Sequence, residues 1–354
     1  YKRQALDGTG NALDNTIIGN SGNNLLDGIT GTDLLIGGSG DDTYVVDGPE
    51  DQIVENAGGG TDTVRAAGNF TLSGNLEKLV LTGTLNANAT GNGEANQIEG
   101  NDGDNRLDGQ QGADTLTGGR GNDTYYVDNI GDVVLEIEDA LGGVDTVVST
   151  IDFTLTDPLR LNIENLTLDG AANLTGIGNA KSNVLTGNSG KNILDGLDGN
   201  DTIDGGGEDD TLLGKVGNDI LLGDLGNDTL DGGIGNDTLT GGVGIDTYVY
   251  NTGAAFATIS PGLDTITDFA AGADKILLDR TTFSFLGGSG SSFTAGKFAS
   301  VANDAGVVGS SAAIVFSIGS GSLFYKSSAA DAGTKFISFL NAPIVADTDF
   351  ILQD

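Results

Sequence analysis

The side chains with the clearest chemical potential in this 354-residue chain are Asp and Asn residues that recur every nine positions. They form three blocks of four, four and eight members. The members are Asn15, Asn24, Asp33 and Asp42, then Asn96, Asn105, Asp114 and Asp123, and finally Asn183, Asn192, Asp201, Asp210, Asp219, Asp228, Asp237 and Asp246. Hard cations such as Ca²⁺ take about six to eight oxygen ligands from carboxylates, amides and backbone carbonyls. The series therefore predicts a row of metal sites, provided that the fold brings these oxygens together.

The composition excludes most other chemistry. The chain has no His and no Cys, which excludes disulfides, Cys/His zinc, haem and iron–sulfur sites, and imidazole or thiolate catalysis. Its 51 acidic and 15 basic residues give a net charge of −36, which argues against nucleic-acid binding. Carboxylate pairs would suit a glycosidase-like site, and a solenoid lyase could combine calcium with a basic residue. Arg and Lys are scattered along the sequence, however, so we expect no enzymatic activity in this chain.

The elements that must position the Asp and Asn side chains follow from the same period. Each nonapeptide begins with Gly, its fourth residue is Gly in twelve of sixteen cases, and its eighth residue is always apolar or Tyr. A helix keeps no single face at this period and is disfavoured by Gly. A Gly-rich turn followed by a short strand fits, because Gly supplies positive φ and the strand points the eighth residue inward. The pattern predicts an all-β, right-handed parallel β-solenoid in which two nonapeptides form one coil.

Coils of eighteen residues would stack the sixth residue of each nonapeptide on the sixth residue two nonapeptides later. This rule gives ten candidate cation sites. Four pair Asp with Asp: Asp201 with Asp219, Asp219 with Asp237, Asp210 with Asp228, and Asp228 with Asp246. Six pair Asn with Asp, and we expect them to be weaker because ligand charge tunes affinity. An alternative for the Asn members is that they cap turns through side-chain hydrogen bonds.

The nonapeptides resemble a known family. The segments Gly-Gly-Ser-Gly-Asp-Asp-Thr-Tyr-Val from Gly37 and Gly-Gly-Ile-Gly-Asn-Asp-Thr-Leu-Thr from Gly232 resemble the repeats-in-toxin (RTX) calcium-binding repeats. The resemblance covers the sixteen nonapeptides, or 144 residues. It implies a hemolysin-type β-roll that binds Ca²⁺, export through a type I secretion exporter, and an extracellular or cell-surface location.

Four regions are expected. Residues 1–90 contain the first repeat block (10–45) and a connecting segment, and residues 91–177 contain the second block (91–126) and a related segment. Residues 178–249 form the third block, and residues 250–354 form a C-terminal cap. The segments 46–90 and 127–177 share motifs such as Phe-Thr-Leu, and we expect them to continue the solenoid without calcium turns. Extra residues near Ala140 and near Pro158 to Leu161 would form loops. Two separate small domains remain the alternative.

The last hundred residues differ in composition from the repeats. Eleven of the 13 Phe lie between Phe256 and Phe350, which predicts a β-rich cap with an aromatic core. The segment Asp264-Thr-Ile-Thr-Asp-Phe, followed by Asp274-Lys-Ile-Leu-Leu, resembles the C-terminal region of exported RTX proteins. The ending Asp349-Phe-Ile-Leu resembles their terminal secretion signal, and it also suits a final edge strand. Removal of the last six residues is expected to block export and to spare folding.

Two functions are compatible with these observations. The first is a secreted structural, surface, matrix or adhesive protein that folds on calcium binding outside the cell. The second is the calcium-dependent folding and type I secretion module of a larger exoenzyme or cytolysin. The chain starts at Tyr1 and contains no Met, which is typical of a processed product or a piece of a longer protein. Expected partners are calcium ions, the exporter, and the cell surface, extracellular matrix or other copies of the chain. Nucleic acid is not expected, nor is a transmembrane segment.

Overall fold

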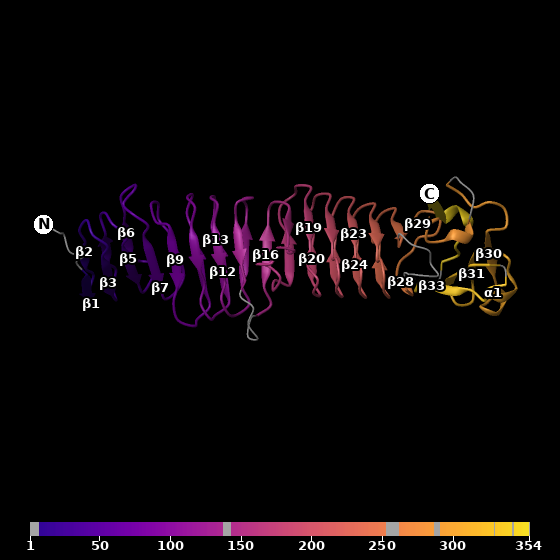
Figure 1. Cartoon of the computed structure of the whole chain (residues 1–354), viewed down its shortest axis with the longest axis horizontal. Helices are drawn as coiled ribbons and strands as arrows, with labels where there is room; N and C mark the ends of the chain where they lie inside the picture. Colours follow the sequence, from indigo (N-terminus) through magenta and orange to yellow (C-terminus); the bar gives the residue numbers. More distant parts are fainter. Residues whose placement is uncertain are drawn as a thin grey trace. The chain divides into compact units, whose positions relative to one another are not determined.

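Each nonapeptide forms a tight turn followed by a strand of three to five residues, and strands eighteen residues apart pair in parallel. Leu26 lies opposite Tyr44 and Leu185 lies opposite Ile203, as expected for coils of two nonapeptides. The computed structural model describes residues 7–136, 143–252, 262–286, 291–328, 330–341 and 343–353. Unit 1 comprises Tyr1–Ile151 and Asp157–Asn165, and unit 2 comprises Asp152–Thr156 and Leu166–Asp354. The predicted all-β fold of stacked parallel coils is confirmed (Figure 1).

Unit 1 contains three sets of parallel strands. One sheet runs in the order β1 (Gly8–Asn11), β3 (Leu25–Ile29), β5 (Thr43–Val46), β7 (Thr63–Ala66), β9 (Lys78–Leu81), β11 (Gln97–Glu99), β13 (Thr115–Thr117) and β15 (Val133–Leu135). A second set contains β8 (Phe70–Thr71), β10 (Ala87–Thr90), β12 (Asn105–Asp108), β14 (Thr124–Val127) and β16 (Thr146–Ser149). The third contains β2 (Thr16–Ile18), β4 (Leu34–Ile36) and β6 (Gln52–Val54).

Unit 2 is built in the same way and ends in a cap. One sheet contains β17 (Phe153–Thr154), β19 (Thr175–Ile177), β21 (Ile193–Asp195), β23 (Thr211–Leu213), β25 (Thr229–Asp231), β27 (Thr247–Tyr250), β29 (Lys275–Asp279) and β34 (Phe350–Gln353). The other contains β18 (Asn165–Leu168), β20 (Val184–Thr186), β22 (Thr202–Asp204), β24 (Ile220–Leu222), β26 (Thr238–Thr240), β28 (Asp264–Ile266), β33 (Thr334–Phe339), β32 (Ser322–Tyr325), β31 (Ile314–Ser317) and β30 (Phe298–Val301). The described helices are α1 (Ala305–Gly309) and the 3₁₀ turns η1 (Ser284–Leu286) and η2 (Asp347–Asp349).

The core is a stack of the eighth residues of the nonapeptides. Fifteen of the sixteen are buried, and Ile17, in the edge strand β2, is half-buried. Burial of one such side chain contributes about 1.5 to 3 kcal/mol, so no single coil is stable without its neighbours.

The strands of the connecting segment 46–90 pair with strands of the coils of unit 1. β6 pairs with β4, β7 pairs with β5 and β9, and β8 pairs with β10, so this segment is not a separate small domain. In the segment 127–177, β15 and β16 pair with β13 and β14 in unit 1, and β17 pairs with β19 in unit 2. The insertion expected near Ala140 lies outside the described residues.

The cap of unit 2 has the predicted aromatic core. Tyr248 of the last nonapeptide packs against Phe269, with ring centroids 5.9 Å apart, and Phe269 packs against Phe339 at 5.2 Å. Only in this part of the described sheets do antiparallel pairs occur, between β31 and β32 and between β32 and β33. The aromatic cluster covers the end of the stack of apolar residues, which would otherwise face water.

The last residues form part of this cap. Strand β34 pairs in parallel with β29, and the side chains of Phe350 and Leu352 are buried. The buried Asp349 carboxylate accepts hydrogen bonds from the backbone N–H groups of Gly272 and Ala346, each at 2.9 Å. The edge-strand interpretation is therefore confirmed. The expectation that the last six residues are dispensable for folding is revised, because their removal would uncover the cap core.

Candidate calcium-binding ladders

The turns of the ten nonapeptides with Asp at the sixth position contain residues with left-handed backbone. Such residues include Gly226 (φ 152°) at the fourth position, and Lys215 (φ 74°) and Asp224 (φ 66°) at the second. A Cβ at Gly226 would overlap the carbonyl oxygen of Glu208 in the preceding coil. Gly at this position therefore permits a backbone contact that a larger residue would block. The result is a column of turns with closely spaced carbonyl groups.

All ten predicted pairs of sixth residues lie in consecutive coils. In each pair, the backbone N–H of the earlier residue donates to Oδ1 of the later Asp, at 2.7 to 3.0 Å. The pairs are Asn15 with Asp33, Asn24 with Asp42, Asn96 with Asp114, Asn105 with Asp123, Asn183 with Asp201, Asn192 with Asp210, Asp201 with Asp219, Asp210 with Asp228, Asp219 with Asp237, and Asp228 with Asp246. Each edge of the coils thus carries a ladder of acidic side chains.

The second carboxylate oxygen of most ladder Asp residues has no partner. Among the described residues, Oδ2 is buried and without a hydrogen bond in nine of the ten: Asp33, Asp42, Asp114, Asp123, Asp201, Asp210, Asp219, Asp228 and Asp237. A buried carboxylate oxygen without a partner is costly. At the first position of the nonapeptide, a Cβ at Gly196 would overlap Oδ2 of Asp201, so Gly leaves this oxygen accessible. These features are those of a cation site, because a bound cation would supply positive charge and would be coordinated by the free oxygens.

The six Asn residues differ from the Asp residues. Oδ1 of each Asn accepts the backbone N–H of the residue four positions earlier, at 2.6 to 2.7 Å, as in Asn20 to Asn24 and Asn179 to Asn183. In the described structure, these side chains therefore cap their own turns. Their amide oxygen is already engaged, which supports the expected lower affinity of the sites that open each block.

Electrostatics in the ladders disfavour ionised Asp in the absence of a cation. Burial raises the pKa of Asp201, Asp210 and Asp237 to about 7 each, although a backbone N–H bond opposes the rise in each case. Neighbouring carboxylates add to the rise, for example Asp219 for Asp201. Without a cation, these groups therefore hold protons at pH values where an exposed Asp is charged.

The ladders extend beyond the nonapeptides through residues that the period of nine did not identify. The backbone N–H of the last Asp of each stack donates to a further Asp, as in Asp33 to Asp51 at 2.9 Å and Asp237 to Asp264 at 3.0 Å. The additional Asp residues are Asp51, Asp62, Asp132, Asp145, Asp264 and Asp274. Each precedes an apolar strand residue by two positions, which is the spacing between the sixth and eighth nonapeptide residues. That spacing, rather than the full period, is the signal that would have found them.

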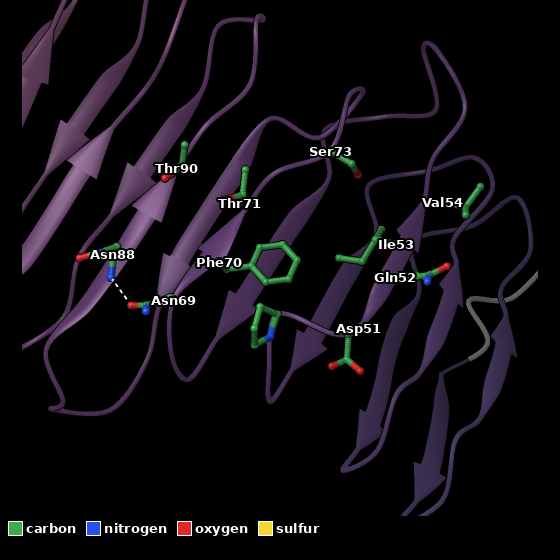
Figure 2. Close-up of a pocket in the computed structure, with 11 residues that line it drawn as sticks. Asp51, Gln52, Ile53, Val54, Asn69, Phe70, Thr71, Ser73, Asn88 and Thr90 are labelled. Atoms are coloured by element: carbon green, nitrogen blue, oxygen red, sulfur yellow. Dashed lines mark hydrogen bonds between the residues drawn. The ribbon is translucent and has the colours of Figure 1, made fainter.

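A pocket in unit 1 is lined by residues of β6 and β8, which belong to different sheets (Figure 2). Its volume is about 570 Å³, and the Phe70 side chain points into it. Asp51 is the only carboxyl group among the lining residues, and its oxygens accept the backbone N–H groups of Asp33 and Asp47. The other lining side chains are neutral, including Asn69 and Asn88. The pocket therefore lacks the pair of free carboxylates that glycoside hydrolysis needs.

Comparison with known families agrees with the geometry. The RTX calcium-binding nonapeptide repeat matches the chain in four copies, at residues 9–44, 90–125, 177–212 and 213–248. No match was found among curated proteins. The matched stretches contain all sixteen ladder residues of the nonapeptides, and repeats of this family bind Ca²⁺. The family match and the stacked parallel coils together support an RTX β-roll with calcium-binding repeats.

Proposed function

We propose that this chain is a secreted protein whose folding is controlled by calcium bound along the two ladders. The observation that carries the proposal is the row of buried Asp Oδ2 atoms without a partner among the described residues. Proteins with these repeats are typically exported by type I secretion, which supports a location outside the cell. No helix in the described part of the chain has the length and apolar character needed to cross a membrane.

The physical basis is a balance between charge repulsion and ion binding. Two effects oppose folding of the calcium-free chain. Its 51 acidic residues repel one another, and its 60 Gly raise the conformational entropy of the unfolded state. Extracellular calcium sites have dissociation constants of about 10⁻⁴ to 10⁻³ M, so they remain empty at cytosolic calcium levels. An ion at about ten to one hundred times its dissociation constant contributes about 1.4 to 2.7 kcal/mol per site. Several sites together would therefore fold the chain after export.

The proposed role is structural, as a surface, matrix or adhesive protein without enzymatic activity. The buried carboxylates of the ladders are stacked on one another, and the pocket beside Phe70 holds one carboxyl group that is already hydrogen-bonded. The neutral lining around Phe70 suits an uncharged polar ligand such as a surface carbohydrate. These observations favour binding and assembly over catalysis.

The second candidate is a folding and export module of a larger exoenzyme or cytolysin. The resemblance of Asp349-Phe-Ile-Leu352 to a terminal secretion signal favours it. Mass analysis of the native secreted species separates the two candidates. A species that consists of repeats and cap supports the structural role, whereas a much longer species with a catalytic domain contradicts it.

Limited proteolysis tests calcium control directly. The chain is incubated with a protease at calcium concentrations from below micromolar to millimolar. We expect rapid cleavage at low calcium and protection of the repeat region near the millimolar range, because the open chain is accessible and the folded coils are not. Equal protection at all calcium concentrations would contradict the proposal. Magnesium at the same concentration serves as the control for ionic strength.

A further inference from the structure

Three carboxylates meet where the first four-nonapeptide block ends. Asp42 belongs to the last nonapeptide, Glu55 follows β6, and Asp62 precedes β7. One oxygen from each lies within 4.8 Å of the others. Asp42 and Asp62 are each 1% exposed, so two of the three charges are buried. Close, buried like charges repel strongly unless a proton or a cation joins them.

The hydrogen bonds leave oxygens free inside this cluster. Oδ1 of Asp42 accepts the Asn24 N–H at 2.7 Å, and Oδ1 of Asp62 accepts the Asp42 N–H at 2.7 Å. Oδ2 of both Asp residues is buried and has no partner among the described residues. A Cβ added at Gly37 would overlap both Oδ2 of Asp42 and Oε1 of Glu55, so these two oxygens converge on one space that only Gly leaves open.

The surroundings supply an additional oxygen and no positive charge. Tyr44 is fully buried, and its hydroxyl donates to Oε1 of Glu55. None of the ion pairs between described residues involves Asp42, Glu55 or Asp62. The cluster therefore offers three carboxylates and a phenol oxygen, a set of hard donors without a compensating Lys or Arg. A divalent cation would neutralise most of this charge.

We propose that Asp42, Glu55 and Asp62 form a block-end site for a hard divalent cation such as Ca²⁺, separate from the sites within the nonapeptides. The family match ends at residue 44, so Glu55 and Asp62 lie outside it. Asp42 is shared between the ladder and the new site. The site would fix the first connecting segment to the end of the repeat block.

The second block repeats the arrangement. A second cluster of three carboxylates consists of Asp123, Glu136 and Asp145, and one oxygen from each again lies within 4.8 Å of the others. The Tyr125 hydroxyl donates a hydrogen bond to Glu136. A Cβ at Gly118 would overlap both Oδ2 of Asp123 and the Tyr125 hydroxyl oxygen. A Cβ at Gly37 would likewise overlap Oδ2 of Asp42 and the Tyr44 hydroxyl oxygen. Because the arrangement recurs in a second block, it is a regular feature of these block ends rather than a chance cluster.

The third block ends differently. The Tyr248 hydroxyl donates to Asp268 at 3.0 Å, and the same carboxylate also accepts the N–H groups of Gly241 and Gly242 at 3.1 and 2.8 Å. Backbone donors therefore satisfy the acid that corresponds to Glu55. We expect cation sites at the first two block ends and none of this type at the third.

Anomalous diffraction from the full chain, crystallised with Tb³⁺ in place of Ca²⁺, locates the ions without any substitution. We expect a peak between the carboxylates of Asp42, Glu55 and Asp62 and a second among Asp123, Glu136 and Asp145. No peak at either position would overturn this proposal, even with ions bound along the nonapeptides. Peaks at the block ends alone would support it and contradict the ladder sites of the proposed function.

Calcium stoichiometry by equilibrium dialysis gives a second test in solution. Glu55→Gln keeps the shape of the side chain and removes one charge, and Glu50→Gln makes the same change at an exposed position of the same segment. We expect Glu55→Gln to bind one ion fewer than the wild-type chain and Glu50→Gln to bind the same number. Equal stoichiometry for both would show that a proton joins the cluster and would overturn the proposal. If Glu55→Gln does not fold at any calcium concentration, the diffraction result decides.

Discussion

Asp219 and Asp237 lie in consecutive coils, and the backbone N–H of Asp219 donates to Oδ1 of Asp237 at 2.8 Å. Each is 1% exposed, and Oδ2 of each has no hydrogen-bond partner among the described residues. One oxygen of each carboxylate thus builds the stack, and the other remains for a ligand. This division explains how the same residue type can fix the register of the coils and make them depend on a cation.

Asp219→Ala should weaken calcium-induced folding more than Asp33→Ala. Asp219 has an Asp above and below it in the stack, Asp201 and Asp237, whereas Asp33 has Asn15 on one side and Asp51 on the other. Loss of ligands from two all-Asp sites would remove about 3 to 5 kcal/mol at saturating calcium, taken as two sites of similar strength. Calcium titration of both variants by circular dichroism measures the difference. A larger shift for Asp33→Ala would contradict the charge argument.

The calcium-free chain should become more stable as the pH falls. Burial raises the pKa of Asp201 and Asp210 to about 7 in the folded chain, and the reference value for Asp is 3.8. Between these values the folded chain holds more protons than the unfolded chain, so the free energy of unfolding decreases as the pH rises. The contribution of these two carboxyl groups to the free energy of unfolding is therefore fully present below about pH 4, and it is lost as the pH rises to about 7.

Denaturation of the metal-free chain at several pH values tests this dependence. Calcium affinity should change in the opposite direction, because protons must leave the carboxylates before the ion binds. A free energy of unfolding that does not change, or that falls on acidification, would show that these carboxylates are ionised in the metal-free fold.

Leu221→Ala should destabilise the chain far more than Leu225→Ala. Leu221 is fully buried in the stack of eighth residues, and Leu225, four positions later, is 60% exposed. The buried substitution should cost about 2 to 5 kcal/mol, and the exposed one should stay within about 0.5 kcal/mol. Urea denaturation at one fixed, saturating calcium concentration measures both. Equal losses would mean that the apolar stack does not carry the stability of the coils.

Removal of residues 349–354 should lower the free energy of unfolding. Strand β34 covers the cap through Phe350 and Leu352, so the loss of two buried side chains should cost about 3 to 6 kcal/mol. Removal of Gln353 and Asp354 alone is the control, because Gln353 is exposed. Denaturation with calcium present compares the two truncations. If the longer truncation is as stable as the full chain, β34 is not needed for folding.

Much of the fold could be predicted from the sequence because the nonapeptide period fixes both the turn and the buried residue. The spacing of sixth residues predicted all ten stacked pairs, since the coil length is constant within each block. It left the role of Asn24 and the other Asn residues open between ligand and turn cap. Only the structure shows that each Asn amide oxygen accepts a backbone N–H of its own turn.

The block-end cluster could not be predicted in the same way. Asp62 follows Asp42 by 20 residues rather than 18, because the connecting segment has a longer turn. The position of Glu55 depends on the path of the chain between β6 and β7, which the nine-residue period does not set. The sequence did contain one usable signal, since Asp62 precedes the buried Val64 by two residues, as Asp42 precedes Tyr44.

Calcium titration of the full chain at neutral pH, followed by far-ultraviolet circular dichroism, tests the central claim most directly. The chain should lack a β-sheet spectrum in the presence of a chelator and should gain it cooperatively as calcium approaches about 10⁻⁴ to 10⁻³ M. Addition of chelator should reverse the change, and magnesium should not replace calcium. A full β-sheet spectrum in the absence of calcium, unchanged on titration, would contradict calcium-controlled folding.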